Sequence, residues 1–242
     1  LGRSGGLIIA SACSIFYGVL LDLEYYGIID SMYAAFGDYP YMPGYVFAGG
    51  TVTSRPPSTG FVQAIQRHFA AGKGAVMLHH ALAGWADWPG WSEMLGGRFL
   101  YQPGEWQAEA WPDSGYRHDV AYEARILVDH PVTRGLPASF PVTDELYLCP
   151  IDESALTPLV RAGGFAFTRN NFYSAAQAVA GAMFSREGWD HPPGSNCIAW
   201  ESRTCPAPLV YIQCGDGPAT YANPHVRRML ANALDYTSGE NT

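Results

Sequence analysis

The sequence is poor in charged residues and has no cluster of basic ones. Asp, Glu, Lys and Arg make up 15% of its 242 residues, and the formal net charge is −8 at pH 7. We expect no nucleic acid partner, because a phosphate backbone requires a basic surface. Since 48% of the residues are hydrophobic, the composition excludes a disordered or coiled-coil protein and favours a globular one.

A long apolar run and a cysteine framework are also missing. Residues 7–23 are fairly apolar, but Ser, Cys, Gly and Asp interrupt them, so we expect no membrane span, and no clear signal-peptide cleavage site follows. No CxxC pair occurs among the scattered cysteines, which are Cys13, Cys149, Cys197, Cys205 and Cys214. This odd set predicts reduced, mostly buried thiols and a cytoplasmic location.

Four common catalytic motifs are absent as well. The chain has no GxGxxG after a strand, no Walker A sequence, no GxSxG elbow and no HExxH. These absences argue against a nucleotide-dependent dehydrogenase, a P-loop enzyme, a serine hydrolase of the elbow type and a zincin. The remaining machinery is histidine, carboxylate, tyrosine and arginine, which suits acid/base chemistry or a modest metal site.

The most informative segment is GKGAVMLHHALAGW, at residues 72–85. Its apolar run Ala75–Leu78 predicts a buried strand, which ends in His79 and His80 and is followed by small residues. Ligands of open α/β sheets bind beyond the carboxyl ends of the strands, so both imidazoles are candidate catalytic groups. In the alternative interpretation one histidine caps a backbone carbonyl and the other packs in the core.

The pattern along the chain predicts a single α/β domain over residues 1–242, with an open, mainly parallel sheet flanked by helices. Residues 7–10 and 45–48 read as strands, residues 49–60 as a loop, and residues 61–72 as an amphipathic helix. Strand, helix and the strand at 75–78 would form a βαβ unit.

The later elements follow from the same kind of pattern. A long loop is expected at 99–118, and Phe140-Pro141 is expected to break the chain before residue 144. Asn223 and Pro224 begin a closing helix that runs to residue 236. Further strands are predicted at residues 120–128, 157–161, 178–183, 197–200 and 209–213.

Aromatic residues are abundant, at 14% of the chain. Trp85, Trp88 and Trp91 recur every third residue after the two histidines. They either bury one side of a short helix in the core or form an aromatic wall over the histidines, where Trp85 would bind substrate.

Five segments in order resemble the trehalose-utilisation (ThuA-like) family, over roughly residues 45–237. They are GKGAVMLHHALAGW, MLGGRF at 94–99, DHPVTRGLP at 129–137, DELY at 144–147 and CGDGPATYANPHVRRMLANALDY at 214–236. Residues 1–44 fit the family poorly. The resemblance implies the fold of the class I glutamine amidotransferase-like superfamily, an open parallel sheet flanked by helices.

The resemblance also bears on chemistry. In those amidotransferases a nucleophilic cysteine follows the strand that corresponds to residues 75–78, whereas here His79 and His80 stand in that turn. We therefore expect no glutamine amidotransferase activity. The family is associated with disaccharides oxidised at carbon 3, which implies a sugar-directed lyase, isomerase or hydrolase acting on a disaccharide or 3-keto-glycoside.

Nine residues are the resulting candidates. The expected catalytic residues are His79, His80, Glu145 and Asp216, and the expected substrate-binding residues are Trp85, Arg117, His118, Tyr147 and Tyr221. Asp216 follows the strand at 209–213, which should bring it to the same edge as the histidines. It stands where the family commonly has histidine, and no histidine precedes His68, whereas the family has one after its first strand. For Asp216 and Glu145 a turn-forming and a solvated role remain the alternatives.

Two other functions stay open at this point. One is a metal-dependent hydrolase, in which His79 or His80 and Glu145 or Asp216 bind a divalent metal, the one candidate cofactor. The other is a carbohydrate-binding or regulatory domain without catalysis. In each case the expected partner is a small-molecule carbohydrate, with no membrane partner and with a homo-oligomer as an open alternative.

Overall fold

The computed structural model describes residues 7–9 and 44–239, which are built around one eight-stranded sheet. The strand order is β1-β4-β12-β11-β9-β7-β10, and β8 pairs with β7. The bounds are β1 Leu7–Ile9, β4 Ala75–Leu78, β7 Gly115–Ile126, β8 Ser139–Leu148, β9 Leu156–Gly163, β10 Tyr173–Ser174, β11 Cys197–Ser202 and β12 Leu209–Ile212. Two hairpins stand outside the sheet, made of β2 Tyr45–Ala48 with β3 Thr51–Ser54 and of β5 Gly104–Trp106 with β6 Glu109–Trp111.

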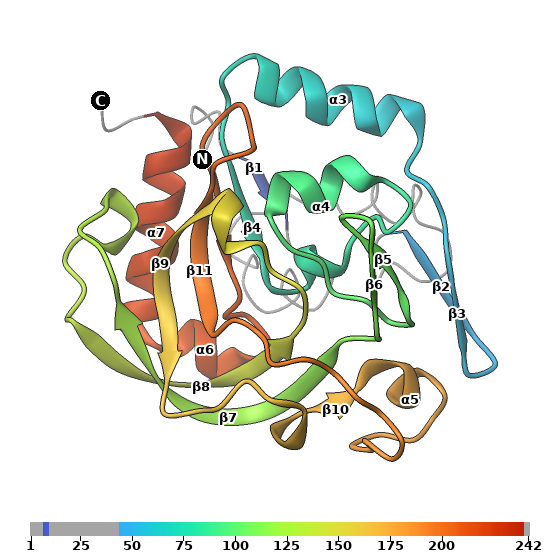
Figure 1. Cartoon of the computed structure of the whole chain (residues 1–242). Coiled ribbons are helices and arrows are strands. Elements are labelled where there is room, and N and C mark those ends of the chain that lie inside the picture. Colours follow the sequence, from blue (N-terminus) through green and yellow to red (C-terminus); the bar gives the residue numbers. More distant parts are fainter. Residues whose placement is uncertain (1–6, 10–43, 240–242) are drawn as a thin grey trace.

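Helices cover both faces of the sheet, with α7 on one side and α3 and α4 on the other (Figure 1). The α-helices are α3 Thr59–Ala70, α4 Pro89–Leu95, α5 Ala175–Val179, α6 Pro218–Ala222 and α7 Pro224–Ser238. Short 3-10 turns are η2 His79–Ala83, η3 Pro131–Thr133, η4 Glu153–Ala155 and η5 Arg169–Asn171. No described helix is both long and apolar enough to cross a membrane.

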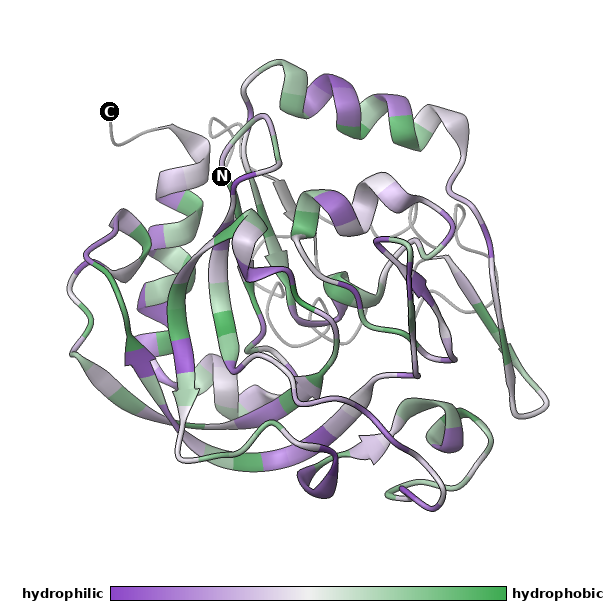
Figure 2. Ribbon diagram, viewed as in Figure 1, coloured by the Kyte–Doolittle hydropathy of each residue, from purple (hydrophilic) through white to green (hydrophobic). Residues whose placement is uncertain are grey.

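Strand β4 lies between β1 and β12, and its two faces pack against different parts of the core. Its side chains alternate, so Val76 and Leu78 pack with α7, whereas Ala75 and Met77 pack with α3 and α4. All four are buried, which explains the unbroken apolar run in the sequence. The longer strands β7 and β8 instead alternate between hydrophilic and hydrophobic residues over much of their length (Figure 2), because one of their faces meets solvent.

The α/β fold class with an open sheet flanked by helices is confirmed, but the sheet is mixed rather than mainly parallel. Parallel pairing joins β1, β4 and β12, while the other strand pairs of the described sheet are antiparallel. The connections explain the difference. Only residues 203–208 join β11 to β12, and a parallel crossover takes about a dozen residues or more.

Two sequence predictions of local structure were wrong. Strand 45–48 does not form a βαβ unit with β4. It pairs in a hairpin with β3, which lies within the predicted loop at 49–60, and β1 is a parallel neighbour of β4. Residues 178–183 are not a strand, since α5 ends at Val179 and a turn follows. The short apolar run there resembles a buried strand by composition alone.

Proline and loop signals also misled the reading of residues 99–148. The predicted loop at 99–118 contains the β5–β6 hairpin and the first residues of β7. Pro141 does not break the chain, because it lies within β8, whose only described neighbour is β7. An edge strand tolerates proline where its missing N–H would face away from the sheet.

The remaining strand predictions and the closing helix are confirmed. The strands expected at 120–128, 157–161, 197–200 and 209–213 correspond to β7, β9, β11 and β12. The Asn223 side chain accepts a hydrogen bond from the His225 N–H and caps α7, with Pro224 at the first helical position. Four cysteines are free thiols, and all but Cys205 are buried. Cys13 lies outside the described residues.

Candidate active site

The turn after β4 holds the two histidines in a fixed conformation. His79 has a φ of 47°, an uncommon value for a residue with a side chain. The hydroxyl of Tyr211, on the neighbouring strand β12, donates to the His79 carbonyl oxygen at 2.8 Å. His79 Nδ1 lies 2.8 Å from the Gln213 carbonyl oxygen, so the end of β12 fixes both the backbone and the ring.

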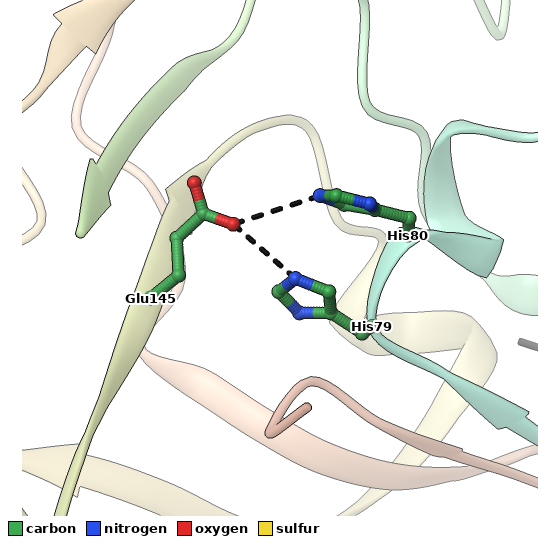
Figure 3. A group of neighbouring side chains, drawn as sticks. All are labelled: His79, His80 and Glu145. Carbon is green, nitrogen blue, oxygen red and sulfur yellow. Dashed lines mark ion pairs between the residues drawn. The ribbon is translucent and has the colours of Figure 1, made fainter. Parts of the chain in front are cut away.

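Glu145 is the centre of the site, because three imidazoles approach its carboxylate. Glu145 Oε2 lies 3.3 Å from His79 Nε2 and 3.6 Å from His80 Nε2 (Figure 3). Glu145 Oε1 lies 3.5 Å from His118 Nδ1. The side chain comes from β8 and is nearly buried, so elements distant in the sequence converge on one carboxylate.

A β-bulge brings His118 to this carboxylate. In the β7–β8 ladder Arg117 pairs with Leu146 and Val120 with Asp144, so His118 and Asp119 together face Glu145. Asp119 has a φ of 54°, which provides the extra residue of the bulge. Bulges re-aim side chains, and this one directs the His118 imidazole toward Glu145 and Asp216.

Asp216 completes the group from the loop after β12. Its two carboxylate oxygens lie 3.7 Å from His79 Nε2 and 3.6 Å from His118 Nδ1. Buried Asp144 fixes this loop by accepting hydrogen bonds from the N–H groups of Gly215 and Asp216, at 2.7 and 3.1 Å. Asp144 also accepts from the Glu145 N–H at 2.9 Å, so one carboxylate positions both acidic residues of the site.

Tyr147 contacts both histidines of the turn. Its hydroxyl lies 2.9 Å from His79 Nε2, and its ring is 5.9 Å from that of His80. The rings of His79 and His80 stack with their centres 4.2 Å apart. We call His79, His80, His118, Glu145 and Asp216 the His–acid cluster.

The cluster gives its members different charge states. Burial disfavours a charged His79, but the nearby carboxylates of Asp216 and Glu145 outweigh it and raise the pKa of His79 to about 10. Burial and the charge of His79 lower the pKa of His80. Asp216 raises the pKa of His118. Burial opposes ionisation of Glu145, yet contact with His79 and His80 lowers its pKa.

Exposure divides the cluster into two tiers. The side chains of His79 and Glu145 are 0% and 4% exposed, so they form a buried tier that a substrate does not reach. The side chains of His80, His118 and Asp216 are 13%, 34% and 35% exposed. A ligand would therefore contact these three side chains, the exposed tier, while the buried tier sets the charge and orientation of the exposed one.

The same residues could hold a divalent metal ion. Ligand atoms of His79, His80 and Glu145 all lie within 4.8 Å of one another, as do those of His118, Glu145 and Asp216. A tetrahedral zinc site with bonds of about 2.1 Å separates its ligand atoms by about 3.4 Å. The two nitrogen–oxygen separations of 3.3 and 3.6 Å around Glu145 Oε2 match this spacing.

Comparison with known proteins agrees with this architecture. A family model described as trehalose utilisation (ThuA) matches residues 48–237. The chain belongs to the ThuA family. A ThuA-like protein of Bacteroides uniformis has a similar structure, with a TM-score of 0.54 at 17% identity, covering 96% of this chain and 90% of that one. A ThuA-like protein of Parabacteroides merdae has a TM-score of 0.57 at 12% identity, covering 97% and 90%. No curated protein matches the sequence.

Within this ThuA family member, six of the nine candidates lie together and three lie apart. The six are the His–acid cluster and Tyr147. Arg117 donates a hydrogen bond to the Tyr173 hydroxyl at 2.5 Å instead of reaching the cluster carboxylates. Trp85 is buried against Phe61 and lines a pocket whose other lining residues are outside the cluster. The Tyr221 hydroxyl donates to the Gly215 carbonyl oxygen at 3.4 Å, so this ring contacts the loop of Asp216.

Sequence reasoning missed Asp144 and Gln213 as supports of the site. Asp144 was not among the candidate residues, although it ties β8 to the loop after β12. Gln213 provides the carbonyl for His79, and its side chain donates to the Glu145 carbonyl oxygen at 3.4 Å. For Gln213 the signal was a polar residue directly after the apolar run Leu209–Ile212, because a polar group buried there costs free energy unless it is paired.

Proposed function

We propose that this chain is a carbohydrate-processing enzyme that acts on a disaccharide or 3-keto-glycoside by acid/base elimination. The observation that carries the proposal is the convergence of three imidazoles on Glu145, at 3.3–3.6 Å. Such a cluster separates the charge states of like groups, which is what paired acid and base catalysis requires. Membership of a family described as trehalose utilisation supports the substrate class.

The chemistry needs one base and one acid. A ketone at C3 acidifies the C2–H of the sugar, and removal of that proton leaves an enolate across C2 and C3. The enolate electrons then form the C1–C2 double bond as the C1–O bond breaks and the carbonyl returns. The glycosidic oxygen leaves with the electron pair and takes up a proton, so no oxidant, reductant or nucleotide is consumed.

His80 and His118 suit these two roles. The lowered pKa of His80 leaves its imidazole neutral at pH 7, able to accept the C2 proton, and Glu145 stabilises the imidazolium that results. The raised pKa of His118 favours its protonated form, which can donate to the leaving oxygen. Asp216 orients His118, and the positive charge of buried His79 offsets the two carboxylates.

The direct test is turnover of 3-keto-trehalose by the purified protein, followed by the release of glucose and of the unsaturated ketone. We expect His80→Asn and His118→Asn each to lower kcat by about 100-fold or more. His225→Asn is the matched control, because His225 lies on α7 and its ring packs against Phe140 of β8, outside the cluster. Absence of wild-type turnover on 3-keto-glycosides would overturn the elimination.

A metal-dependent hydrolase is the second candidate, favoured by the ligand spacing around Glu145 Oε2. Elemental analysis of the purified protein, followed by zinc titration in a thermal-shift assay, separates the two. A stoichiometric metal that raises the melting temperature, together with loss of activity on chelation, would favour hydrolysis. A carbohydrate-binding domain without catalysis would bind the sugar and turn over none. A cytoplasmic location and a homo-oligomer stay predictions from the sequence.

A further inference from the structure

The loop after α5 presents an apolar side chain in an uncommon way. Phe184 is 56% exposed and has a φ of 60°, a conformation that bulky residues rarely adopt. Its N–H donates a hydrogen bond to the Tyr116 hydroxyl at 2.9 Å, which holds the loop against β7. Backbone strain that neighbouring groups maintain is typical of ligand-binding segments.

Phe184 lies beside the His–acid cluster. Its ring is 6.2 Å from the imidazole of His118 in an edge-to-face arrangement, and it also contacts the rings of Tyr116 and Tyr173, at 6.3 and 5.5 Å. We call Tyr116, Tyr173 and Phe184 the aromatic platform. It adjoins His118, which in the proposed function donates a proton to the oxygen of the leaving sugar.

Two arginines flank the aromatic platform. The guanidinium carbons of Arg117 and Arg186 lie 4.8 and 4.6 Å from the centre of the Tyr173 ring. In the described part of the chain the arginines that form carboxylate ion pairs are others, Arg161 and Arg169. Apart from the Arg117 N–H that donates to the Tyr173 hydroxyl, the N–H groups of Arg117 and Arg186 are therefore available to ligand oxygens. Aromatic faces beside hydrogen-bond donors suit sugar rings, which have apolar faces and a rim of hydroxyl groups.

We propose that the aromatic platform is a subsite for the leaving sugar of a disaccharide, with Phe184 stacked on its pyranose ring. This inference rests on the proposed function, which places the reacting sugar over His80 and the leaving oxygen at His118. The platform would select glycosides with a second ring over those with a small leaving group. In this subsite Phe184 and Tyr173 would contact the sugar ring, and Arg186 would donate to its hydroxyl groups.

The test compares 3-keto-trehalose with methyl 3-keto-α-glucoside, which lacks the second ring. Phe184→Ala should lower kcat/KM for 3-keto-trehalose by about tenfold through KM, and leave the methyl glycoside unchanged. Phe184→Tyr keeps a ring and should restore the wild-type value. Leu127→Ala is the matched control, because Leu127 is a similarly exposed apolar residue, at 44%, in the segment after β7.

Binding of trehalose, measured by calorimetry, separates this subsite from the elimination itself. Weaker trehalose binding by Phe184→Ala would support the subsite even if the wild type turned over no 3-keto-glycoside. Turnover of both substrates with equal kcat/KM in wild type and Phe184→Ala would overturn the subsite and leave the elimination standing. No trehalose binding by a wild type that is also inactive would overturn both. Because Phe184 and Leu127 are both exposed, we expect their variants to fold.

Discussion

Asp216 is the most exposed carboxylate of the His–acid cluster, and it contacts two imidazoles at once. Asp216→Asn preserves the shape of the side chain and removes its charge. We expect turnover of 3-keto-trehalose to fall by at least about tenfold, with the melting temperature intact. Because Asp216 raises the pKa of His118, its removal should lower that pKa and move the alkaline limb of the pH–rate profile to lower pH.

A matched variant sharpens this experiment. Asp119→Asn removes an exposed charge that also raises the pKa of His118, but less than Asp216 does, so it should move the alkaline limb less. If Asp216→Asn had wild-type turnover and an unmoved alkaline limb, Asp216 would be a turn residue only. His79, His80 and Glu145 would then remain as the candidates of the original set.

Asp144 serves the site through the backbone rather than through substrate. Its carboxylate accepts three N–H groups, from Glu145, Gly215 and Asp216. Asp144→Ala leaves these donors unsatisfied in a buried place, and we expect the free energy of unfolding to fall by about 2–4 kcal/mol. Asp144→Asn keeps one acceptor oxygen and should lose less. Equal stability of both variants and the wild type in urea would contradict this role.

The residues of the site were only partly predictable from the sequence. His79, His80 and Asp216 follow buried parallel strands, and the carboxyl ends of such strands meet at one edge, so their proximity could be expected. The position of His118 depends on a bulge, which no spacing rule reveals. Arg117 is a residue type that binds substrates, but side chains alternate along β7, and that of Arg117 extends to Tyr173 and not to the cluster.

At the scale of the elements, Gly74 before β4 allows α7 and the segment before β12 to approach the backbone closely. A Cβ on Gly74 would lie 2.5 Å from the Thr237 carbonyl oxygen of α7 and 2.6 Å from the Pro208 carbonyl oxygen. Backbone atoms cannot give way as a flexible side chain does, so Gly74→Ala should destabilise the protein by about 2 kcal/mol or more.

Gly60 in α3 offers the control for that substitution. Its Cβ would meet only Ser58 Oγ, at 4.0 Å, so Gly60→Ala should be neutral or stabilise the helix by up to about 1 kcal/mol. Urea unfolding of the two variants measures both effects. A Gly74→Ala variant as stable as Gly60→Ala would show that the ends of α7 and β4 can separate without cost.

The elements themselves show where sequence patterns suffice. Buried runs such as Leu209–Ile212 and the capped helix after Asn223 are determined locally, and their positions were predicted within a few residues. Pairing is not local. Tyr45–Ala48 has the composition of a sheet strand, yet the nearby segment Thr51–Ser54 closes a hairpin with it, and three residues near the start of the chain pair with β4 instead.

At the scale of the whole protein, one carboxylate outside the site joins three segments, which are β11, α7 and the turn before η3. Glu201 on β11 accepts a hydrogen bond from the Tyr236 hydroxyl of α7 at 2.6 Å. Its other oxygen lies 3.3 Å from His130 Nε2, in the turn before η3. α7 also contributes Val226 and Met229 to the core of the sheet, so this contact fastens a helix on which the hydrophobic cluster depends.

Glu201 should therefore make stability depend on pH. Burial opposes its ionisation, but the contacts with His130 and Tyr236 prevail and lower its pKa. A depressed folded-state pKa stabilises the protein above the unfolded-state value, near 4.5, and this contribution is lost as the pH falls through the folded value. We expect Glu201→Gln to cost about 1 kcal/mol at pH 7 and less at pH 3.

Urea unfolding of wild type and Glu201→Gln at both pH values measures that difference. Glu123→Gln is the control, because Glu123 is exposed on β7 and should behave as the wild type does at either pH. Tyr236→Phe removes only the donor to Glu201 and should reproduce part of the loss at pH 7. A Glu201→Gln deficit that stayed the same at pH 3 would mean that the carboxylate charge contributes nothing, and that Glu201 stabilises the protein through contacts that do not depend on its ionisation.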